Sequence, residues 1–124
     1  MSLYKINYFH WHLTDYPAWR IECKAYPQLN DAQYQRPGRD CGKFYTYDEI
    51  RALIAYAKER GVTIMPEIDM PGHATAFTKT FPEFDAGFRT VNPADENLYT
   101  VLGTVIKELA ELFPGRYIHI GGDE

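Results

Sequence analysis

Cysteine is scarce in this chain, and basic residues are not in excess. The two cysteines, Cys23 and Cys41, allow at most one internal disulfide, and the sequence leaves open whether they pair or remain free thiols. Neither a C-x-x-C spacing nor a cluster of histidine and cysteine indicates a zinc site. The formal net charge of −4 gives no basic footprint, so we expect no nucleic-acid partner.

Long hydrophobic runs are also missing. No apolar stretch is long enough to span a membrane, so we expect no membrane partner. A signal peptide is absent too, but residues 1–3 are interpreted as a cloning scar on an excised segment, so this absence says little about the compartment. The 124 residues contain no internal repeat, low-complexity tract or domain linker, and are treated as one unit or a piece of a larger one.

Three segments have the pattern of β-strands, and the third lies at the end of the chain. Residues 4–13 (YKINYFHWHL) place histidines on one face and large rings on both. We therefore expect both faces to be covered, as in a parallel strand. Residues 62–70 and 116–124 are the second and third predicted strands. Residues 14–45, rich in turn chemistry, are predicted to be an irregular loop, and a loop of this length is usually functional.

Two amphipathic helices separate the strands. Thr46 and Glu49 form a T-x-x-E capping box in front of apolar residues at helical spacing, and Gly61 follows as a cap. Leucine and valine recur at the same spacing over 98–112, and a shorter helix is expected near 74–80. The order strand, helix, strand, helix, strand predicts an α/β fold with a parallel sheet and right-handed crossovers.

Polar residues gather at the carboxyl ends of all three predicted strands, where parallel α/β folds build their sites. They are His10, His12, Asp15, Glu67, Asp69, His73, His119, Asp123 and Glu124. For His10 and His119 a role as satisfied core histidines is as well supported as a role as ligands, and Glu67 also fits a buried structural acid. Gly121 and Gly122 allow a turn or a close approach just before the last two acids.

Two chemistries fit this set of residues. A metal-dependent hydrolase would use the His10-x-His12 pair with further histidine and aspartate ligands, but it leaves the Asp123–Glu124 doublet unexplained. A glycoside hydrolase needs a general acid and a group that stabilises the sugar cation, and it uses the doublet directly. A third hypothesis is a non-catalytic module that folds and self-associates.

Four motifs in order then resemble one family: FHWHLTD, WRIE, PEIDMPGH and HIGGDE are similar to those of glycoside hydrolase family 20, the β-N-acetylhexosaminidases. The resemblance covers nearly the whole chain. It implies a (β/α)8 TIM barrel of which residues 1–124 supply strands two to four and the two crossover helices. A full barrel takes about 250 residues, so the resemblance implies a fragment of the catalytic domain.

The resemblance also implies site roles, an N-acetylhexosamine-terminated glycan or chitooligosaccharide as substrate, and no cofactor or metal. Glu124 matches the general acid/base, and Asp123 matches the residue that orients the 2-acetamido group of the substrate. Asp15 and His73 match a relay that supports Glu124, and Asp69 matches a further active-site acid. His10, His12, Glu67 and His119 are expected to bind substrate or support the site.

One departure from the family pattern follows Asp15, where Tyr16 and Pro17 replace the second acid that is frequent there. The sequence also leaves open whether Glu124 is native or vector-derived, although the motif predicts glutamate. The open sheet edges of such a fragment predict self-association, and the isolated chain is expected to be inactive. The compartment stays unknown, and the resemblance implies an exported parent enzyme, whether periplasmic, secreted or lysosomal.

Overall fold

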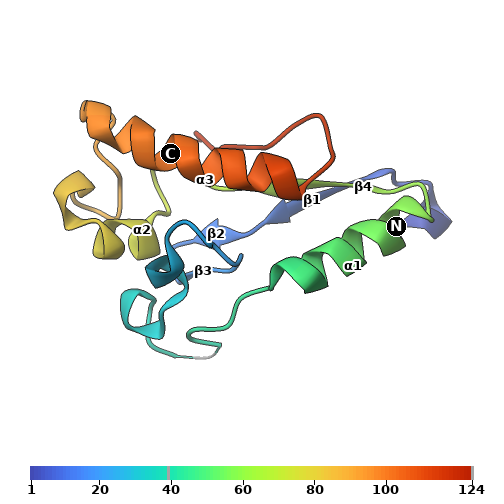
Figure 1. Ribbon diagram of the computed structural model, residues 1–124, viewed down its shortest axis with the longest axis horizontal. Helices are drawn as coiled ribbons and strands as arrows, with labels where there is room; N and C mark the ends of the chain where they lie inside the picture. The colour runs from blue at the N-terminus through green and yellow to red at the C-terminus, as the bar shows by residue number, and fades with distance from the viewer. Residues whose placement is uncertain (39, 124) are drawn as a thin grey trace.

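The structure is a computed structural model, and it describes residues 1–38 and 40–123. Two strands, β1 (Tyr8–His12) and β4 (Thr63–Glu67), form the central sheet, and β2 (Thr14–Asp15) and β3 (Ala18–Trp19) form a small hairpin beside it. The helices are α1 (Tyr47–Lys58), α2 (Thr75–Thr80) and α3 (Glu96–Leu112). Figure 1 shows α1 and α3 running along the central sheet, one on each side of it in this view.

The central sheet is parallel, as predicted. β1 pairs with β4 in a register that runs from Tyr8 opposite Thr63 to His12 opposite Glu67. The two strands therefore end together, and their last side chains meet at one edge. The α/β class with a parallel sheet, expected from the sequence, is confirmed.

The prediction of a third strand over residues 116–124 is wrong, because the described residues of this segment form no regular strand. Residues 116–124 contribute one parallel bridge, between His119 and Glu67, within the described part of the chain. The backbone N–H groups of Ile68 and Met70 donate to the carbonyls of His119 and Ile120 at 3.0 and 3.1 Å. The segment thus runs beside the end of β4, but the left-handed backbone at Gly121 (φ 71°) and Gly122 (φ 93°) turns it out of the strand conformation.

The other two strands are shorter than predicted. Ser2–Tyr4 form a 3₁₀ turn, and Lys5 has a left-handed φ of 57°, so an extended backbone begins only near Tyr8. The prediction that both faces of residues 4–13 are covered is also wrong, because burial alternates along β1. Tyr8, His10 and His12 are exposed, whereas Phe9 and Trp11 pack against the core. The exposed face is the one that carries the histidines.

The two long helices follow their predicted signals. Thr46 caps α1, and its side chain and that of Glu49 form the reciprocal capping box. Gly61 then takes a left-handed φ of 67° after the helix. α3 is capped by Asp95, and its buried side chains recur at helical spacing: Leu98, Leu102, Val105, Leu109 and Leu112. The short helix expected near 74–80 is present as α2.

The core lies between the helices and the central sheet. Ile50 from α1, Ile64 and Ile68 from the β4 region, and Leu98 from α3 are at most 4% exposed. Burying such a side chain contributes about 1.5–3 kcal/mol relative to exposure. This packing holds the ends of β1 and β4 in place.

The predicted loop over 14–45 is mostly irregular, with the β2–β3 hairpin and two short 3₁₀ turns, η2 (Pro27–Asn30) and η3 (Ala32–Tyr34). Buried Asn30 holds it together: its side chain accepts from the N–H of Cys23 and donates to the carbonyl of Ile21. Cys23 and Cys41 are free thiols. Of the helices described, none combines the length and apolar character needed to cross a membrane.

Candidate active site

The ends of the parallel segments open into one groove. Seven of the nine predicted site residues line it: His10, His12, Glu67, Asp69, His73, His119 and Asp123, together with Gly121 and Gly122. Its volume of about 610 Å³ lies within the range for small-molecule sites, and the groove is open to solvent. The sequence places these residues far apart, and the parallel register brings them to one edge.

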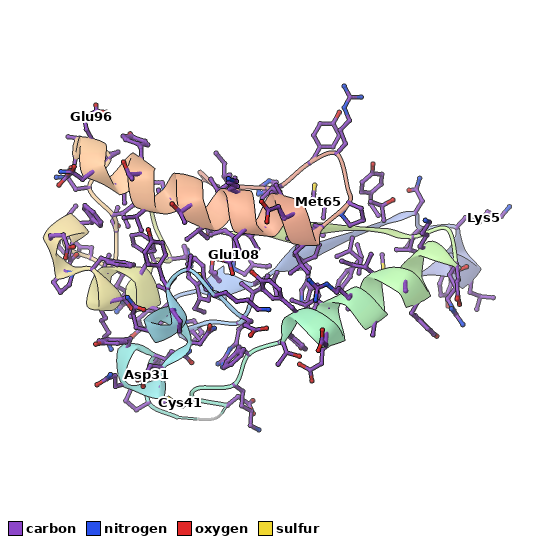
Figure 2. All side chains as sticks on the ribbon, in the orientation of Figure 1. Lys5, Asp31, Cys41, Met65, Glu96 and Glu108 are labelled. Carbon is purple, nitrogen blue, oxygen red and sulfur yellow. The ribbon has the colours of Figure 1, made fainter. Side chains whose placement is uncertain are left out.

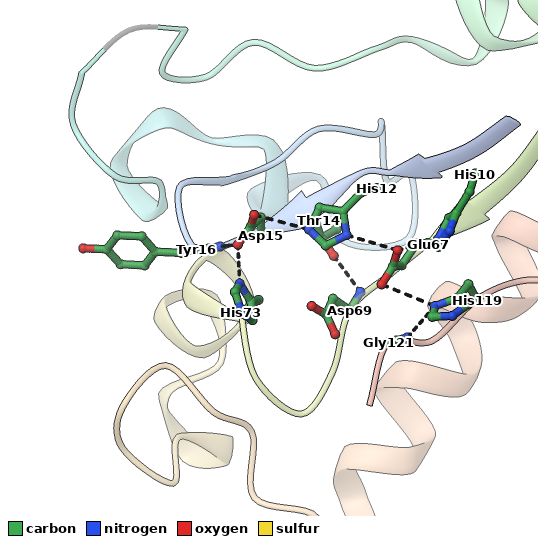
Figure 3. A network of polar contacts seen from close by, with 10 residues as sticks. All are labelled: His10, His12, Thr14, Asp15, Tyr16, Glu67, Asp69, His73, His119 and Gly121. Atoms are coloured by element: carbon green, nitrogen blue, oxygen red, sulfur yellow. Dashed lines mark hydrogen bonds and ion pairs between the residues drawn. The ribbon is translucent and has the colours of Figure 1, made fainter. Parts of the chain in front are cut away.

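Asp15 and His73 are in direct contact. The Nδ1 atom of His73 meets Oδ1 of Asp15, and the backbone N–H of Tyr16 donates to the same oxygen. Asp15 ends the short strand β2, whereas His73 follows β4 with a left-handed φ of 53°. A non-glycine residue in this conformation is uncommon, and here it turns the imidazole toward the carboxylate (Figure 3).

Glu67 is the centre of a second group of contacts. Its carboxylate lies 2.5 Å from Nε2 of His10, 3.2 Å from Nδ1 of His12 and 3.3 Å from Nδ1 of His119. The Glu67 side chain is 9% exposed, whereas each of the three imidazoles is more than 40% exposed. A buried acid is thus covered by three imidazoles that face the groove.

Asp69 packs against the backbone of Gly121. A β-carbon built on Gly121 would lie 1.7 Å from Oδ1 of Asp69, so only glycine fits at position 121 without a shift. The backbone N–H of Asp69 donates to Oγ1 of Thr14 at 2.9 Å. These contacts fix a buried carboxylate at the base of the groove, and Asp123 lines the same groove two residues beyond Gly121.

Glu124, the predicted general acid, lies outside the residues that the structure describes. Its role therefore stays a prediction, as do the roles given to the other site residues. What the structure adds is their placement: Asp15 and His73 form one contact group, and Glu67 with its three histidines forms another.

Charge complementarity sets the protonation states in these groups. Burial raises the pKa of Asp15, but the contacts with His73, Tyr16 and His12 outweigh it and hold that pKa below its ordinary value of 3.8. Burial likewise raises the pKa of Glu67, but His12 and His10 bring it below 4.5. Both acids therefore stay ionised at neutral pH.

Two supporting residues were missed from the sequence. Thr14 holds the backbone of Asp69, and Tyr16 donates its backbone N–H to Asp15. Thr14 lies inside the motif HLTD, directly before a predicted site acid, so its position was a usable signal. The Tyr16 contact uses only the main chain, which no side-chain pattern reveals. The Tyr16 ring points away from the groove (Figure 3) and lies 3.6 Å from the guanidinium of Arg89.

Two sets of side chains could present ligand atoms to a cation. They are His10, Glu67 and His119, and His12, Glu67 and Asp69, each with ligand atoms within 4.8 Å of one another. Glu67 belongs to both sets, so the two sites could not be filled independently. The three imidazoles already pair with the Glu67 carboxylate.

The chain is similar in sequence to known proteins. The whole chain, residues 1–124, matches the family model described as glycosyl hydrolase family 20, catalytic domain. A β-hexosaminidase of Vibrio furnissii is 45% identical over 150 residues, which cover 100% of this chain and 24% of that protein. The subunit beta of human β-hexosaminidase is 31% identical and is covered over 23% of its length.

Solved structures agree with the sequence relatives. The β-N-acetylhexosaminidase from Bacteroides fragilis superposes with a TM-score of 0.89 at 39% identity, over 99% of this chain and 26% of that one. An exo β-N-acetylglucosaminidase from Vibrio harveyi, solved in complex with N-acetylglucosamine, has a TM-score of 0.85 at 39% identity and is covered over 23%. The chain thus spans about a quarter of the length of these relatives.

Proposed function

Because the chain belongs to glycosyl hydrolase family 20, we propose that a complete enzyme containing it hydrolyses terminal β-linked N-acetylhexosamine. The substrate would be a glycan or chitooligosaccharide that ends in N-acetylglucosamine or N-acetylgalactosamine. We further propose that residues 1–124 supply strands two to four of its barrel. The observation that carries the proposal is the contact of Asp15 with His73, which lines the groove together with Asp69 and Asp123.

The adjacent acids Asp123 and Glu124 suit a substrate-assisted mechanism. Ordinary retaining glycosidases place two carboxylates about 5–5.5 Å apart on opposite sides of the sugar, an arrangement that neighbours in one chain reach poorly. In the proposed mechanism the acetamide oxygen of the substrate attacks the anomeric carbon while Glu124 gives a proton to the leaving oxygen. Water then opens the oxazolinium intermediate, and Glu124 takes a proton back.

Asp123 has a different task in this mechanism. Its carboxylate would accept the N–H of the acetamide and stabilise the positive charge that develops there. His73 would exchange charge with Glu124, and Asp15 would hold the tautomer of His73 through the observed contact at Nδ1. Asp69 would shape the base of the groove.

The test uses a complete enzyme that contains this segment, assayed on an aryl N-acetyl-β-glucosaminide and on the matching aryl glucoside. Asp123→Asn should reduce kcat/KM for the acetamide substrate by about 100-fold or more and affect the glucoside far less. Glu124→Gln should spare substrates with activated leaving groups, because these need little acid assistance. A harmless Asp123→Asn would contradict the assignment.

The chain alone is proposed to be inactive and to self-associate. β1 pairs with β4 on one side only, within the described residues, so its other edge presents unpaired backbone groups. Ile6, Tyr8 and Ile120 are each about half exposed near this sheet. Light scattering after size exclusion should give a mass above one chain that rises with concentration, and a monodisperse monomer would contradict this. The aryl substrates should show no turnover by the chain itself.

A further inference from the structure

His12 lies between two carboxylates from different strands. Its Nδ1 atom lies 3.2 Å from Oε2 of Glu67, and its Nε2 atom lies 3.3 Å from Oδ2 of Asp15. Figure 3 shows the His12 ring between the two acids, with His73 below Asp15 and His119 beyond Glu67. The ring therefore connects the two contact groups of the groove.

The chemistry of imidazole makes this position selective for one protonation state. Neutral imidazole has one N–H and one lone pair, so one of the two contacts would set a lone pair against a carboxylate oxygen. Imidazolium has an N–H on both nitrogens and satisfies both acids. Burial alone lowers the pKa of His12, but the contacts with Glu67 and Asp15 outweigh it and raise that pKa above its ordinary value of 6.5.

Other charged groups around His12 act in both directions. Asp69 lies close to His12 and Glu67 on the groove side, and its negative charge also favours imidazolium. On the opposite side His12 borders a pocket whose charged residues are Arg20, Asp40, Lys43 and Glu49. There Lys43 pairs with Asp40 at 2.9 Å, and the Arg20 guanidinium donates to the carbonyls of Asp40 and Lys43. The charges in direct contact with His12 are therefore the two acids.

We propose that His12 is a positioning residue that remains protonated and holds the Asp15 carboxylate in place for His73. This inference rests on the proposed function, because it gives His12 a task in supporting the Asp15–His73 pair. The contacts divide the two oxygens of Asp15 between two rings: Oδ1 meets His73 and Oδ2 meets His12. Rotation of the carboxylate would break both contacts, so the imidazolium fixes its orientation.

Glu67 forms the other contact of the His12 ring. It ends β4 opposite His12 in the parallel register, and it is the less exposed of the two acids, at 9% against 41% for Asp15. The buried Glu67 carboxylate holds the imidazolium in place, and the imidazolium in turn orients the more exposed Asp15 carboxylate. This gives a reason for a buried glutamate in PEIDMPGH that touches neither Asp123 nor His73 in the described contacts.

The first test is a titration of the ring nitrogens of the histidines by ¹⁵N NMR on this chain, with His12 assigned through His12→Gln. We expect the His12 ring to titrate with a midpoint above 6.5, with both nitrogens protonated below that midpoint. Glu67→Gln should lower the midpoint, whereas Glu83→Gln, which removes an equal charge from an exposed turn, should leave it unchanged. A His12 midpoint at or below 6.5 would overturn the proposal, as would a midpoint indifferent to Glu67→Gln.

The second readout concerns positioning itself. His12→Gln should alter the titration and tautomer of His73, since Asp15 loses one of its two imidazole partners. An unchanged His73 signal in a folded His12→Gln variant would overturn the positioning role. In an active complete enzyme, His12→Gln should move the acidic limb of kcat/KM to higher pH, because the pKa of Asp15 rises without the neighbouring cation. A uniform loss with an unmoved limb would point to a merely structural residue.

The two proposals fail in different ways. A complete enzyme that leaves aryl N-acetyl-β-glucosaminides intact would refute the hydrolase function, and the spectra of the chain would still decide the state of His12. Conversely, an active enzyme with a neutral His12 would refute only the inference about His12.

Discussion

The backbone of Gly121 lies against the Asp69 carboxylate so closely that a β-carbon at position 121 would sit 1.7 Å from Oδ1 of Asp69. Gly121 also has a φ of 71°, in the left-handed region that favours glycine. One residue thus serves two purposes: it turns the final segment toward Asp123, and it leaves room for a buried acid.

Gly121→Ala should displace Asp69 and lower kcat/KM of a complete enzyme about 100-fold, since a misplacement of about 1 Å has effects of that size. The matched control is Gly122→Ala. Its φ of 93° is strained for alanine as well, but a β-carbon there meets no described atom within 4 Å. Both variants should lose about 1–2 kcal/mol of stability, and only Gly121→Ala should lose most of the activity. Equal activity losses would contradict this account of Asp69.

A second prediction concerns Glu108, which joins α3 to the loop before α1. Its carboxylate accepts the backbone N–H groups of Lys24 and Ala25 and the hydroxyl of Tyr47, and Figure 2 shows it on the side of α3 that faces this loop. Glu108→Gln should lower the free energy of unfolding by about 1–3 kcal/mol, because hydrogen bonds to a charged acceptor are lost.

The control for Glu108 is Glu111→Gln on the exposed side of the same helix. It should change the free energy of unfolding by less than about 0.5 kcal/mol. Urea denaturation followed by circular dichroism measures both. If the two variants lost the same stability, the contacts of Glu108 would not be what holds α3 to the loop.

The sequence predicted the parts of the fold that depend on local signals. The capping box at Thr46 and Glu49 and the apolar spacing of α3 are set within a few residues, and both are confirmed. The failure at 116–124 has a non-local cause. The alternation of Tyr117 to Ile120 suits a strand, but the segment pairs with β4 only around His119 before the glycines turn it away.

Much the same division applies to the site. Alignment of polar residues at strand ends follows from the parallel topology, so the common groove was predictable from His10, Glu67 and Asp123. The partners within it were not, because they depend on backbone turns. The left-handed conformation of His73 brings its ring to Asp15, and nothing in the motif PGH predicts this conformation.

A third prediction follows from the pKa shifts of the network. The pKa values of Asp15 and Glu67 are lowered on folding, so their stabilisation is present above their ordinary values of 3.8 and 4.5 and is lost as pH falls through the native values. The pKa of His12 is raised, so its stabilisation is complete below 6.5 and is lost as pH rises through the native value. The network should therefore stabilise most between about pH 4.5 and 6.5.

The measurement is the difference in urea midpoint between the wild-type chain and His12→Gln at several pH values. The difference should be largest near pH 6, shrink toward pH 8 and shrink again below pH 4. Added salt should reduce it only in part, because Glu67 is shielded from solvent. A difference that grew from pH 6 to pH 8 would reverse the sign of the His12 contribution and contradict the account.

The last prediction separates the glycosidase from a metal-dependent hydrolase. A cation could be bound by His10 and His119 with Glu67, or by His12 with Glu67 and Asp69, but each of these rings already lies within 3.3 Å of the Glu67 carboxylate. A metal would have to displace protons that hold these contacts, and deprotonating His12 is opposed by two acids. Dialysis of a complete enzyme against EDTA should therefore leave kcat/KM on the aryl N-acetyl-β-glucosaminide unchanged. Loss of activity that Zn²⁺ or Mn²⁺ restores would instead assign the histidines to a metal and remove the substrate-assisted mechanism.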